Sequence, residues 1–209
     1  MAKRISILGS TGSIGVNTLV VIDQLDEDLE VVYLSAYQNA KKIIEQAKKY
    51  RPKAVAVINH SSAVEVKDGL TGENIDVLMG REGLLEISQR DDVDLLMNGL
   101  VGAAGMEPTL NAVKVGVDVA LSNKESLVMA GDIINRTKEK TGASIYPVDS
   151  EHSAIWQCLT GEKLEDVRRI ILTGSGGPFR TRDVKTFSDI TVNEALNHPN
   201  WDMGNKITI

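Results

Sequence analysis

Apolar segments and helix-like segments alternate along residues 1–149. Seven apolar segments have the length of a β-strand: 4–9, 29–36, 53–58, 75–80, 92–100, 116–122 and 143–149. Between them, the spacing of apolar residues predicts helices over 13–25, 39–50, 60–70, 82–89, 107–115 and 124–140. Strands that are apolar on both faces and alternate with helices are typical of a parallel sheet covered on both sides. The pattern therefore predicts a doubly wound α/β fold.

The pattern changes after about residue 150. Residues 165–173 (EDVRRIILT) have the pattern of one more strand, but 174–183 are rich in glycine and polar residues. The stretch HPNWDMGNKITI (198–209) ends inside a strand-like pattern, whose backbone groups need a partner strand. We therefore expect residues 1–149 to form a complete α/β domain and residues 150–209 to begin a second domain, of the α+β class.

Composition and charge narrow the class of protein. A formal net charge of -6 argues against nucleic acid or an anionic membrane as the main partner, since both call for basic patches. Cys158 is the single cysteine, so no disulfide forms within the chain, which fits a reducing compartment. No apolar run reaches membrane-spanning length, and the chain enters its first strand too early for a signal peptide. We expect a cytoplasmic protein.

A glycine-rich loop, GSTGSIG (9–15), lies between the first strand and the first helix. This is the position of the dinucleotide-binding loop in Rossmann-type folds, although the commoner motif has a glycine where this chain has Thr11. At Gly12 the backbone can approach a pyrophosphate, and the helix offers its N-terminal amides. A tight turn without a ligand is the alternative. Position and glycine density together favour a nucleotide.

The end of the second strand indicates which nucleotide binds. NAD sites usually carry an acidic residue there, which binds the ribose hydroxyls. Residues 34–42 (LSAYQNAKK) contain no acid, whereas Asn39, Lys41 and Lys42 offer groups for a 2′-phosphate. Alternatively, the two lysines lie on a solvated helix face. The missing acid favours NADP.

Polar residues follow two of the later strands as well. Residues 98–105 (NGLVGAAG) form a glycine-rich turn that suits either a cofactor or close packing of helix on sheet. In LSNKES, Ser122 or Asn123 suits a helix cap, and Glu125 suits the first helical turn. Lys124 is poorly placed there, because it faces the positive end of the helix dipole. An anionic or carbonyl-bearing ligand would explain it.

A pair of acids, Asp149 and Glu151, flanks Ser150 at the end of the last apolar segment. If the strand continues through Glu151, the two carboxylates project from one face, because side chains alternate along a strand. A divalent cation would relieve their repulsion, and oxygen ligands suit Mg²⁺ or Mn²⁺. The alternative is that Asp149 or Ser150 caps the helix that follows. Three polar strand ends facing one crevice favour the metal.

Two motifs after residue 150 suit a phosphorylated substrate. Residues 175–179 (SGGPF) offer a nest of backbone amides for a phosphate, assisted by the hydroxyl of Ser175. His198, Trp201 and Met203 form an amphipathic cluster on a loop bounded by proline and glycine, which suits a lid. A plain flexible loop and ordinary packing residues are the alternatives.

Together, these motifs resemble one enzyme family. GSTGSIG, LSNKESLV, PVDSEHSAIWQCL, SGGPFR and HPNWDMGNKITI occur in the order found in the 1-deoxy-D-xylulose 5-phosphate reductoisomerases of the non-mevalonate isoprenoid pathway. The resemblance implies an NADPH-dependent homodimer that uses Mg²⁺, Mn²⁺ or Co²⁺. The implied reaction rearranges a ketose phosphate to a branched aldehyde, which hydride transfer then reduces to 2-C-methyl-D-erythritol 4-phosphate.

The resemblance also implies roles for individual residues. The residues that would contact NADPH are Thr11, Gly12, Ser13 and Ile14 at the pyrophosphate, and Asn39, Asn123, Glu125 and Gly204 elsewhere. The implied metal ligands are Asp149 and Glu151. The implied substrate-binding residues are Lys124, Ser150, Glu151, Ser175, His198 and Trp201, of which Trp201 would close over the substrate. Lys124, Asp149 and Glu151 would form the catalytic centre.

The chain departs from the family pattern in two places. After the second strand the family usually has Gly, a basic residue and Asn, where this chain has Tyr37, Gln38 and Asn39. The sequence also stops before the next family motif, of the form DSATMMNKGLE, which supplies a third carboxylate to the metal, and before the C-terminal helical domain. We therefore expect residues 150–209 to be an incomplete catalytic domain, and these 209 residues alone to turn over substrate poorly or not at all.

Two other kinds of function agree with a nucleotide-binding fold: a non-catalytic binding module and a different NADP-dependent oxidoreductase. A non-catalytic NADP-binding module would have the glycine loop but no need for the lysine and the acid pair. A semialdehyde dehydrogenase needs a nucleophilic cysteine, and Cys158 lies in a helical pattern with no base evident nearby. A sugar-nucleotide reductase often has a Tyr-x-x-x-Lys pair, and the pair of Tyr37 and Lys41 comes too early in the chain.

Overall fold

The computed structural model describes residues 2–173 and 176–200, and the chain divides into two compact units, Met1–Gly161 and Glu162–Ile209. The first unit extends past residue 149 because helix α7 (Ser150–Leu159) packs against strand β7 (Ile145–Pro147). The assignment of functional domains on either side of residue 149 stays a prediction, because compactness alone does not test it.

The elements of the first unit follow the predicted alternation of strand and helix. The other strands are β1 (Lys3–Leu8), β2 (Leu29–Ala36), β3 (Ala54–Val57), β4 (Asp76–Met79), β5 (Leu95–Asn98) and β6 (Asp118–Leu121). The other helices are α1 (Ser13–Gln24), α2 (Ala40–Tyr50), α3 (His60–Gly69), α4 (Gly80–Ile87), α5 (Met106–Lys114) and α6 (Glu125–Thr141). In the described part of the chain, no helix has both the length and the apolar character needed to cross a bilayer.

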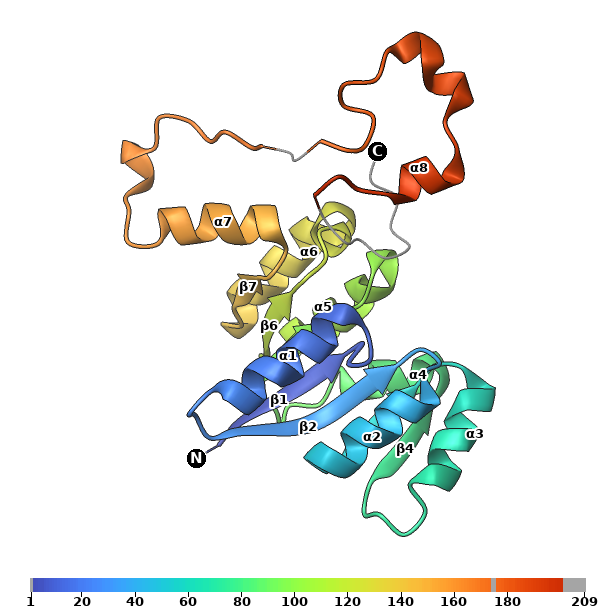
Figure 1. The fold of residues 1–209 in the computed structure, drawn as a ribbon. Coiled ribbons are helices and arrows are strands. Elements are labelled where there is room, and N and C mark those ends of the chain that lie inside the picture. Colours follow the sequence, from blue (N-terminus) through green and yellow to red (C-terminus); the bar gives the residue numbers. More distant parts are fainter. Residues whose placement is uncertain (1, 174–175, 201–209) are drawn as a thin grey trace. The chain divides into compact units, whose positions relative to one another are not determined.

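The strands of the first unit form one parallel sheet in the order β4-β3-β2-β1-β5-β6-β7 (Figure 1). The chain winds outward from β1 to β4, returns to the other side of β1 and winds outward again to β7. The reversal puts a topological switch point between β1 and β5, where ligands of open α/β sheets bind. The predicted doubly wound, Rossmann-type fold is confirmed.

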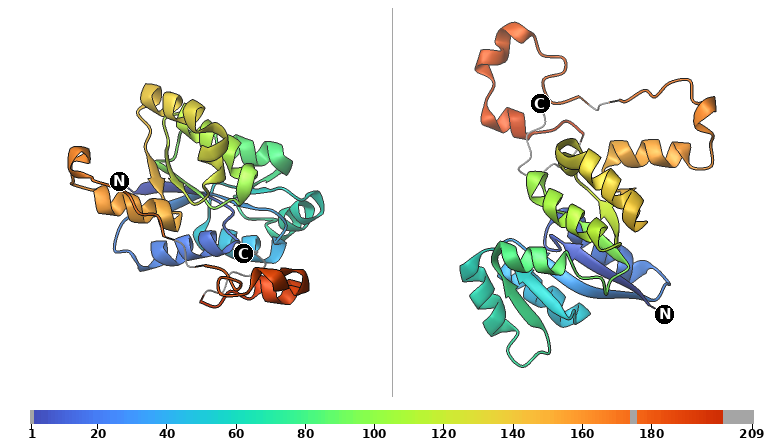
Figure 2. Two further views of the ribbon diagram at one scale, coloured as in Figure 1. Left: turned by 90° about the horizontal axis from the view of Figure 1, so that it is seen from above. Right: turned by 180° about the vertical axis from the view of Figure 1, so that it is seen from behind.

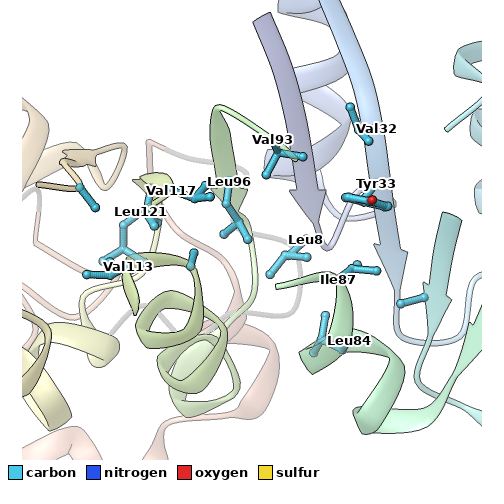
Figure 3. Packing of buried hydrophobic residues seen from close by; sticks show 14 of the residues in the cluster. Leu8, Val32, Tyr33, Leu84, Ile87, Val93, Leu96, Val113, Val117 and Leu121 are labelled. Atoms are coloured by element: carbon cyan, nitrogen blue, oxygen red, sulfur yellow. The ribbon is translucent and has the colours of Figure 1, made fainter. Parts of the chain in front are cut away.

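Helices cover both faces of the sheet (Figure 2, left). Helices α1, α2 and α3 bury apolar side chains on one face, and α4, α5 and α6 do so on the other. The alternation of side chains along β1 serves both layers, since Ile7 packs with the first group and Leu8 with the second. Figure 3 shows Leu8 and Leu96 of the central strands among the side chains of the second layer, including Leu84, Ile87 and Val113.

A salt bridge joins the two central strands at their amino ends. The carboxylate of Asp94 accepts hydrogen bonds from the backbone N–H of Arg4 (2.7 Å) and from its Nε (3.2 Å) and Nη2 (3.0 Å). The Arg4 side chain, together with its backbone amide, lowers the pKa of Asp94 to about 2. This contact fixes β1 against the residue that precedes β5, at the edge of the sheet opposite to the switch-point crevice.

The second unit contains helical turns in its described residues. These are two 3₁₀ segments, Leu164–Asp166 and Val184–Asp189, and a short helix α8 (Val192–Leu196) that Thr191 and Glu194 cap reciprocally. The prediction of a strand over 165–173 is wrong, because 167–173 have no regular structure and Ile171 is 67% exposed. A strand needs a partner for its backbone groups, and the described residues of this unit offer none.

The lowered pKa of Asp94 predicts how the stability of the fold depends on pH. A carboxylate whose pKa is lower in the folded state stabilises the protein above its unfolded pKa of about 4, and this contribution is lost as the pH falls toward 2. We therefore expect Asp94→Asn to lower the free energy of unfolding at pH 7, with a difference from the parent that shrinks between pH 4 and pH 3.

Urea denaturation of both proteins at pH 7, 5, 4 and 3 measures this difference. Asp91→Asn, which changes an exposed aspartate in the same loop, is the control and should behave like the parent. A deficit of D94N that is the same at pH 7 and pH 3 would contradict the assignment.

Candidate functional site

Two glycine-rich turns meet at the switch point of the sheet. One is the glycine loop, residues 9–15, between β1 and α1, and the other is the turn after β5, which contains a 3₁₀ segment (Gly102–Gly105). The N–H of Gly99 donates to the carbonyl of Leu8 (3.0 Å), and a Cβ placed on Gly9 would lie 3.2 Å from the Gly99 oxygen. The predicted crevice therefore lies between the carboxyl ends of β1 and β5, and backbone atoms of the two turns form its base.

The three glycines of the glycine loop have different roles. Gly9 has φ +76°, a conformation that favours glycine. A Cβ at Gly15 would lie 2.4 Å from the Gly9 oxygen, so this glycine allows α1 to pack directly on the turn. At Gly12 the closest such contact is an ordinary 3.4 Å, and φ is -77°. The fold of the chain therefore requires Gly9 and Gly15, whereas glycine at position 12 suits the N-cap of α1 and also leaves room for a ligand to approach the backbone.

The start of α1 suits an anion. Gly12 occupies the N-cap position, so no side chain caps the helix, and its first turn contains no acidic residue. Gly12 and Ser13 are exposed, and Thr11 and Ile14 are half-buried. Helix N-terminal amides with this exposure bind phosphate groups through their N–H groups and the helix dipole.

The turn after β2 also lies on this edge of the sheet. Asn39 is the N-cap of α2, and its Oδ1 accepts a hydrogen bond from the N–H of Lys42 (3.1 Å). Tyr37 and Gln38, which precede it, are exposed, as is Lys41. The structure therefore places the residues predicted for the 2′-phosphate at the crevice edge, and it gives Asn39 a capping role as well.

Two asparagines hold the turn after β5, and the sequence indicated only one of them. Asn98 is fully buried, donates to the carbonyl of Gly105 (2.8 Å) and accepts from the N–H of Leu100 (3.2 Å). Asn123 donates to the carbonyl of Leu100 (3.1 Å) and accepts from the N–H of Ser126 (3.1 Å), so it also caps α6. Glu125, the first residue of α6, is exposed.

Lys124, the lysine that is poorly placed at the positive end of the helix dipole, lies between the two acids. Lys124 Nζ is 3.2 Å from Asp149 Oδ2 and 3.3 Å from Glu151 Oε2. The hydrogen bond to Asp149, followed by that to Glu151, raises the pKa of Lys124. The pKa of Glu151 is lowered, first by its own backbone N–H and then by Asp149 and Lys124. The two carboxylates explain why a lysine is stable at the positive end of α6.

The prediction of how Asp149 and Glu151 converge is wrong in one respect. Strand β7 ends at Pro147, so the alternation of a continuing strand does not align the two acids. Asp149 is instead the N-cap residue of α7, and Glu151 lies in the first turn of that helix. The turn between β7 and α7 brings both acids to Lys124. This is possible because β6 and β7 are parallel, so both strands end at the same edge of the sheet.

Asp149 has the surroundings of a metal ligand. Its side chain makes no capping hydrogen bond although it occupies the cap position. The side chain is 13% exposed, its Oδ1 is buried without a hydrogen-bond partner in the described residues, and His152 Nδ1 lies 3.4 Å from that oxygen. An orphaned buried oxygen is costly, and a cation would satisfy it.

The donor set fits Mg²⁺ or Mn²⁺ better than a transition metal that prefers sulfur. Asp149 and Glu151 supply hard oxygen donors, and Mg²⁺ keeps several waters when one or two carboxylates hold it. Within residues 2–173 and 176–200, no three His, Cys, Asp or Glu side chains form a complete metal site. The two acids can therefore hold part of the coordination shell.

The roles expected for the remaining site residues stay predictions. Ser150 is exposed at the start of α7. His198 belongs to the second unit, where its Nδ1 accepts a hydrogen bond from the N–H of Asn200 (3.0 Å). Ser175, Trp201 and Gly204 lie outside the described residues.

Comparison with known proteins connects these features to one family. The family model of 1-deoxy-D-xylulose 5-phosphate reductoisomerase matches residues 5–131, and the model of the C-terminal domain of the same enzyme matches residues 145–209. A relative with this enzyme's name from Chloroherpeton thalassium is 55% identical over 99% of the chain and 54% of its own length. Another, from Protochlamydia amoebophila, is 47% identical over 99% of the chain and 53% of its own length.

Solved structures give the same result. A DOX-P reductoisomerase in complex with NADPH, fosmidomycin and magnesium is 36% identical, with a TM-score of 0.88 over 97% of this chain and 52% of that one. The Zymomonas mobilis enzyme in complex with NADPH is also 36% identical, with a TM-score of 0.86 over 95% of this chain and 52% of that one. The chain thus spans about half the length of the relatives that it matches.

The matched regions contain both parts of the candidate site. The first includes the glycine loop and Lys124, and the second includes Asp149 and Glu151. With the fold and the sequence in agreement over nearly its whole length, the chain belongs to the 1-deoxy-D-xylulose 5-phosphate reductoisomerase family.

Proposed function

We propose that this chain is the NADPH- and metal-binding part of an enzyme that converts 1-deoxy-D-xylulose 5-phosphate to 2-C-methyl-D-erythritol 4-phosphate. One observation supports this proposal most directly: Lys124 bridges Asp149 and Glu151 beside a dinucleotide-type crevice. The relatives are named for this substrate, and a solved relative contains NADPH and magnesium. Since those relatives are about twice as long, the activity is proposed for the whole protein.

The order of the strands suggests how NADPH lies along the crevice. We place the adenosine end near the turn after β2, with Asn39, Lys41 and Lys42 for the 2′-phosphate. The pyrophosphate then lies on the amides of the glycine loop, from Thr11 to Ile14, beside β1. This direction brings the nicotinamide toward the turns after β5 and β6, where Asn123 and Glu125 lie. A contact from Gly204 stays a prediction.

The charged cluster is suited to the rearrangement step. A divalent cation bound there supplies Lewis-acid stabilisation of negative charge on the substrate oxygens. Asp149 and Glu151 are the residues that would hold it. The ammonium of Lys124, a permanent charge at neutral pH, adds stabilisation of the oxyanion that develops as the carbon–carbon bond shifts. NADPH bound along the crevice would supply the hydride that reduces the branched aldehyde to the alcohol.

Other parts of the proposal rest on the family resemblance alone. These are substrate contacts from Ser150, Ser175 and His198, closure by Trp201, use of Co²⁺, assembly as a homodimer and a cytoplasmic location. A non-catalytic NADP-binding module is the second candidate function. The lysine–carboxylate cluster favours the enzyme, because nucleotide binding alone does not require a buried carboxylate oxygen that lacks a hydrogen-bond partner among the described residues.

Gly12 and Gly15 provide a matched pair of substitutions for the cofactor site. Gly12→Ala adds a methyl group where we place the pyrophosphate, and neither φ nor packing opposes it. We expect it to weaken NADPH binding by about tenfold or more, which is about 1.4 kcal/mol, while the melting temperature falls much less than in Gly15→Ala. Gly15→Ala should instead lower the melting temperature, because its Cβ would lie 2.4 Å from the Gly9 oxygen.

Titration of NADPH fluorescence and thermal denaturation measure the two effects. A G12A protein that binds NADPH as tightly as the parent would exclude the placement of the pyrophosphate on this loop.

Lys124 provides a test of the cation site. Its ammonium repels a divalent cation held by the same two carboxylates, and a unit charge at about 4 Å in water contributes about 1 kcal/mol. Because Mn²⁺ carries two charges, this repulsion amounts to about 2 kcal/mol, so we expect Lys124→Met to bind Mn²⁺ roughly thirtyfold more tightly than the parent and Asp149→Asn to lose binding. Lys138→Met, in the last turn of α6, is the control for a general change in charge.

Electron paramagnetic resonance of free Mn²⁺ gives the Mn²⁺ affinities of the parent and of the three variants without any turnover. Weaker Mn²⁺ binding by K124M than by K138M, or unchanged binding by D149N, is incompatible with the proposed site.

A further inference from the structure

Three buried polar side chains lie beneath the glycine loop. Ser10 and Ser35 are fully buried and Gln46 is 8% exposed, and they come from the loop, from β2 and from α2 respectively. The hydroxyl of Ser35 accepts from the N–H of Gly9 (2.9 Å), and the carbonyl of Ser35 accepts from the N–H of Ser10 (2.8 Å). This anchoring network fixes the loop where it leaves β1.

Gln46 makes two contacts with Ser10. Its Nε2 donates to the carbonyl oxygen of Ser10 (2.8 Å), and its Oε1 accepts from the Ser10 hydroxyl (2.7 Å). Both polar atoms of the amide are therefore satisfied at a buried position of the helix. On the same helix, Ile43 and Ala47 are fully buried among apolar side chains. An apolar residue at 46 would suit such packing without the cost of burying an amide.

The bond to the Ser10 carbonyl sets the direction of the next amide. A trans peptide is planar, so the C=O of Ser10 and the N–H of Thr11 point in opposite directions. Since Gln46 holds this carbonyl on the side of α2, the N–H of Thr11 points away from α2. Within the described residues, this N–H has no acceptor. It is thus an unused donor at the position where a phosphate is expected.

We propose that Gln46 is a positioning residue for nucleotide binding. By holding the Ser10 carbonyl, it orients the N–H of Thr11 toward the pyrophosphate of the bound dinucleotide. Gln46 touches neither the nucleotide nor the reacting atoms in this role. The inference rests on the proposed binding of NADPH to the glycine loop.

Gln46→Met is the variant that tests the role. Methionine has nearly the volume of glutamine and removes both hydrogen bonds to Ser10 without leaving a buried cavity. We expect the dissociation constant for NADPH to rise by about tenfold, because the oriented donor is lost. Binding of adenosine 2′-monophosphate, which has no pyrophosphate, should change by less than about twofold.

Two control variants separate this role from a loss of stability. Ile43→Val removes a methylene group from the buried face of the same helix and leaves the anchoring network intact. Ser10→Ala removes the hydroxyl but keeps the bond from Gln46 Nε2 to the Ser10 carbonyl. Both should lower the melting temperature and bind both nucleotides within about twofold of the parent.

Fluorescence titration with NADPH, calorimetric titration with adenosine 2′-monophosphate and thermal denaturation complete the experiment. Equal weakening of both nucleotides by Q46M, or no weakening of either, would overturn the role of Gln46. Loss of NADPH affinity by I43V in proportion to its melting temperature would overturn it as well. If Q46M does not fold, Gln46→Leu replaces it with the same expected results. A parent protein that does not bind NADPH overturns the proposed function itself, and with it this inference.

Discussion

The parallel direction of the strands is the constraint on which the whole site depends. Since every strand of the sheet ends at the same edge, the turns after β2, β1, β5, β6 and β7 lie side by side there in that order. Neighbouring strands are about 4.8 Å apart, so β1 and β7, three strand intervals apart, are separated by about 14 Å. A dinucleotide loop and a carboxylate pair that are far apart in the sequence thus share one crevice. The salt bridge of Arg4 with Asp94 holds the opposite edge, away from this chemistry.

The lysine between the two acids has a structural and a chemical consequence. Asp149 and Glu151 would repel each other without a cation, and the ammonium of Lys124 supplies the balancing charge within the chain itself. The pKa of Glu151, the more exposed of the two acids, is lowered by its own backbone N–H, by Asp149 and by Lys124. An ionised pair is the form that a divalent cation requires.

Much of the fold follows from the sequence, because short continuous apolar runs indicate buried strands and a period of 3.6 indicates amphipathic helices. The turn at Asp149 was harder to predict, since a cap residue and the last residue of a strand both adopt extended backbone angles. The error over 165–173 arises because a strand needs a partner strand, and the local pattern of apolar residues does not show whether one is present. The role of Gln46 does not follow from the sequence, because a polar residue in an amphipathic helix normally indicates the solvent face. Its role depends on Ser10 and Ser35, which are neighbours only in the folded chain.

We place the cation site at the nicotinamide end of the crevice, since β7 and β2 are on opposite sides of β1. Bound Mn²⁺ speeds the relaxation of nearby protons, so proton relaxation of NADPH on the protein measures its distance from each end of the cofactor. After subtraction of the rates measured with Asp149→Asn, we expect the nicotinamide H4 protons to relax faster than adenine H2. Adenine relaxation that is as fast or faster, or rates that D149N leaves unchanged, would contradict the arrangement.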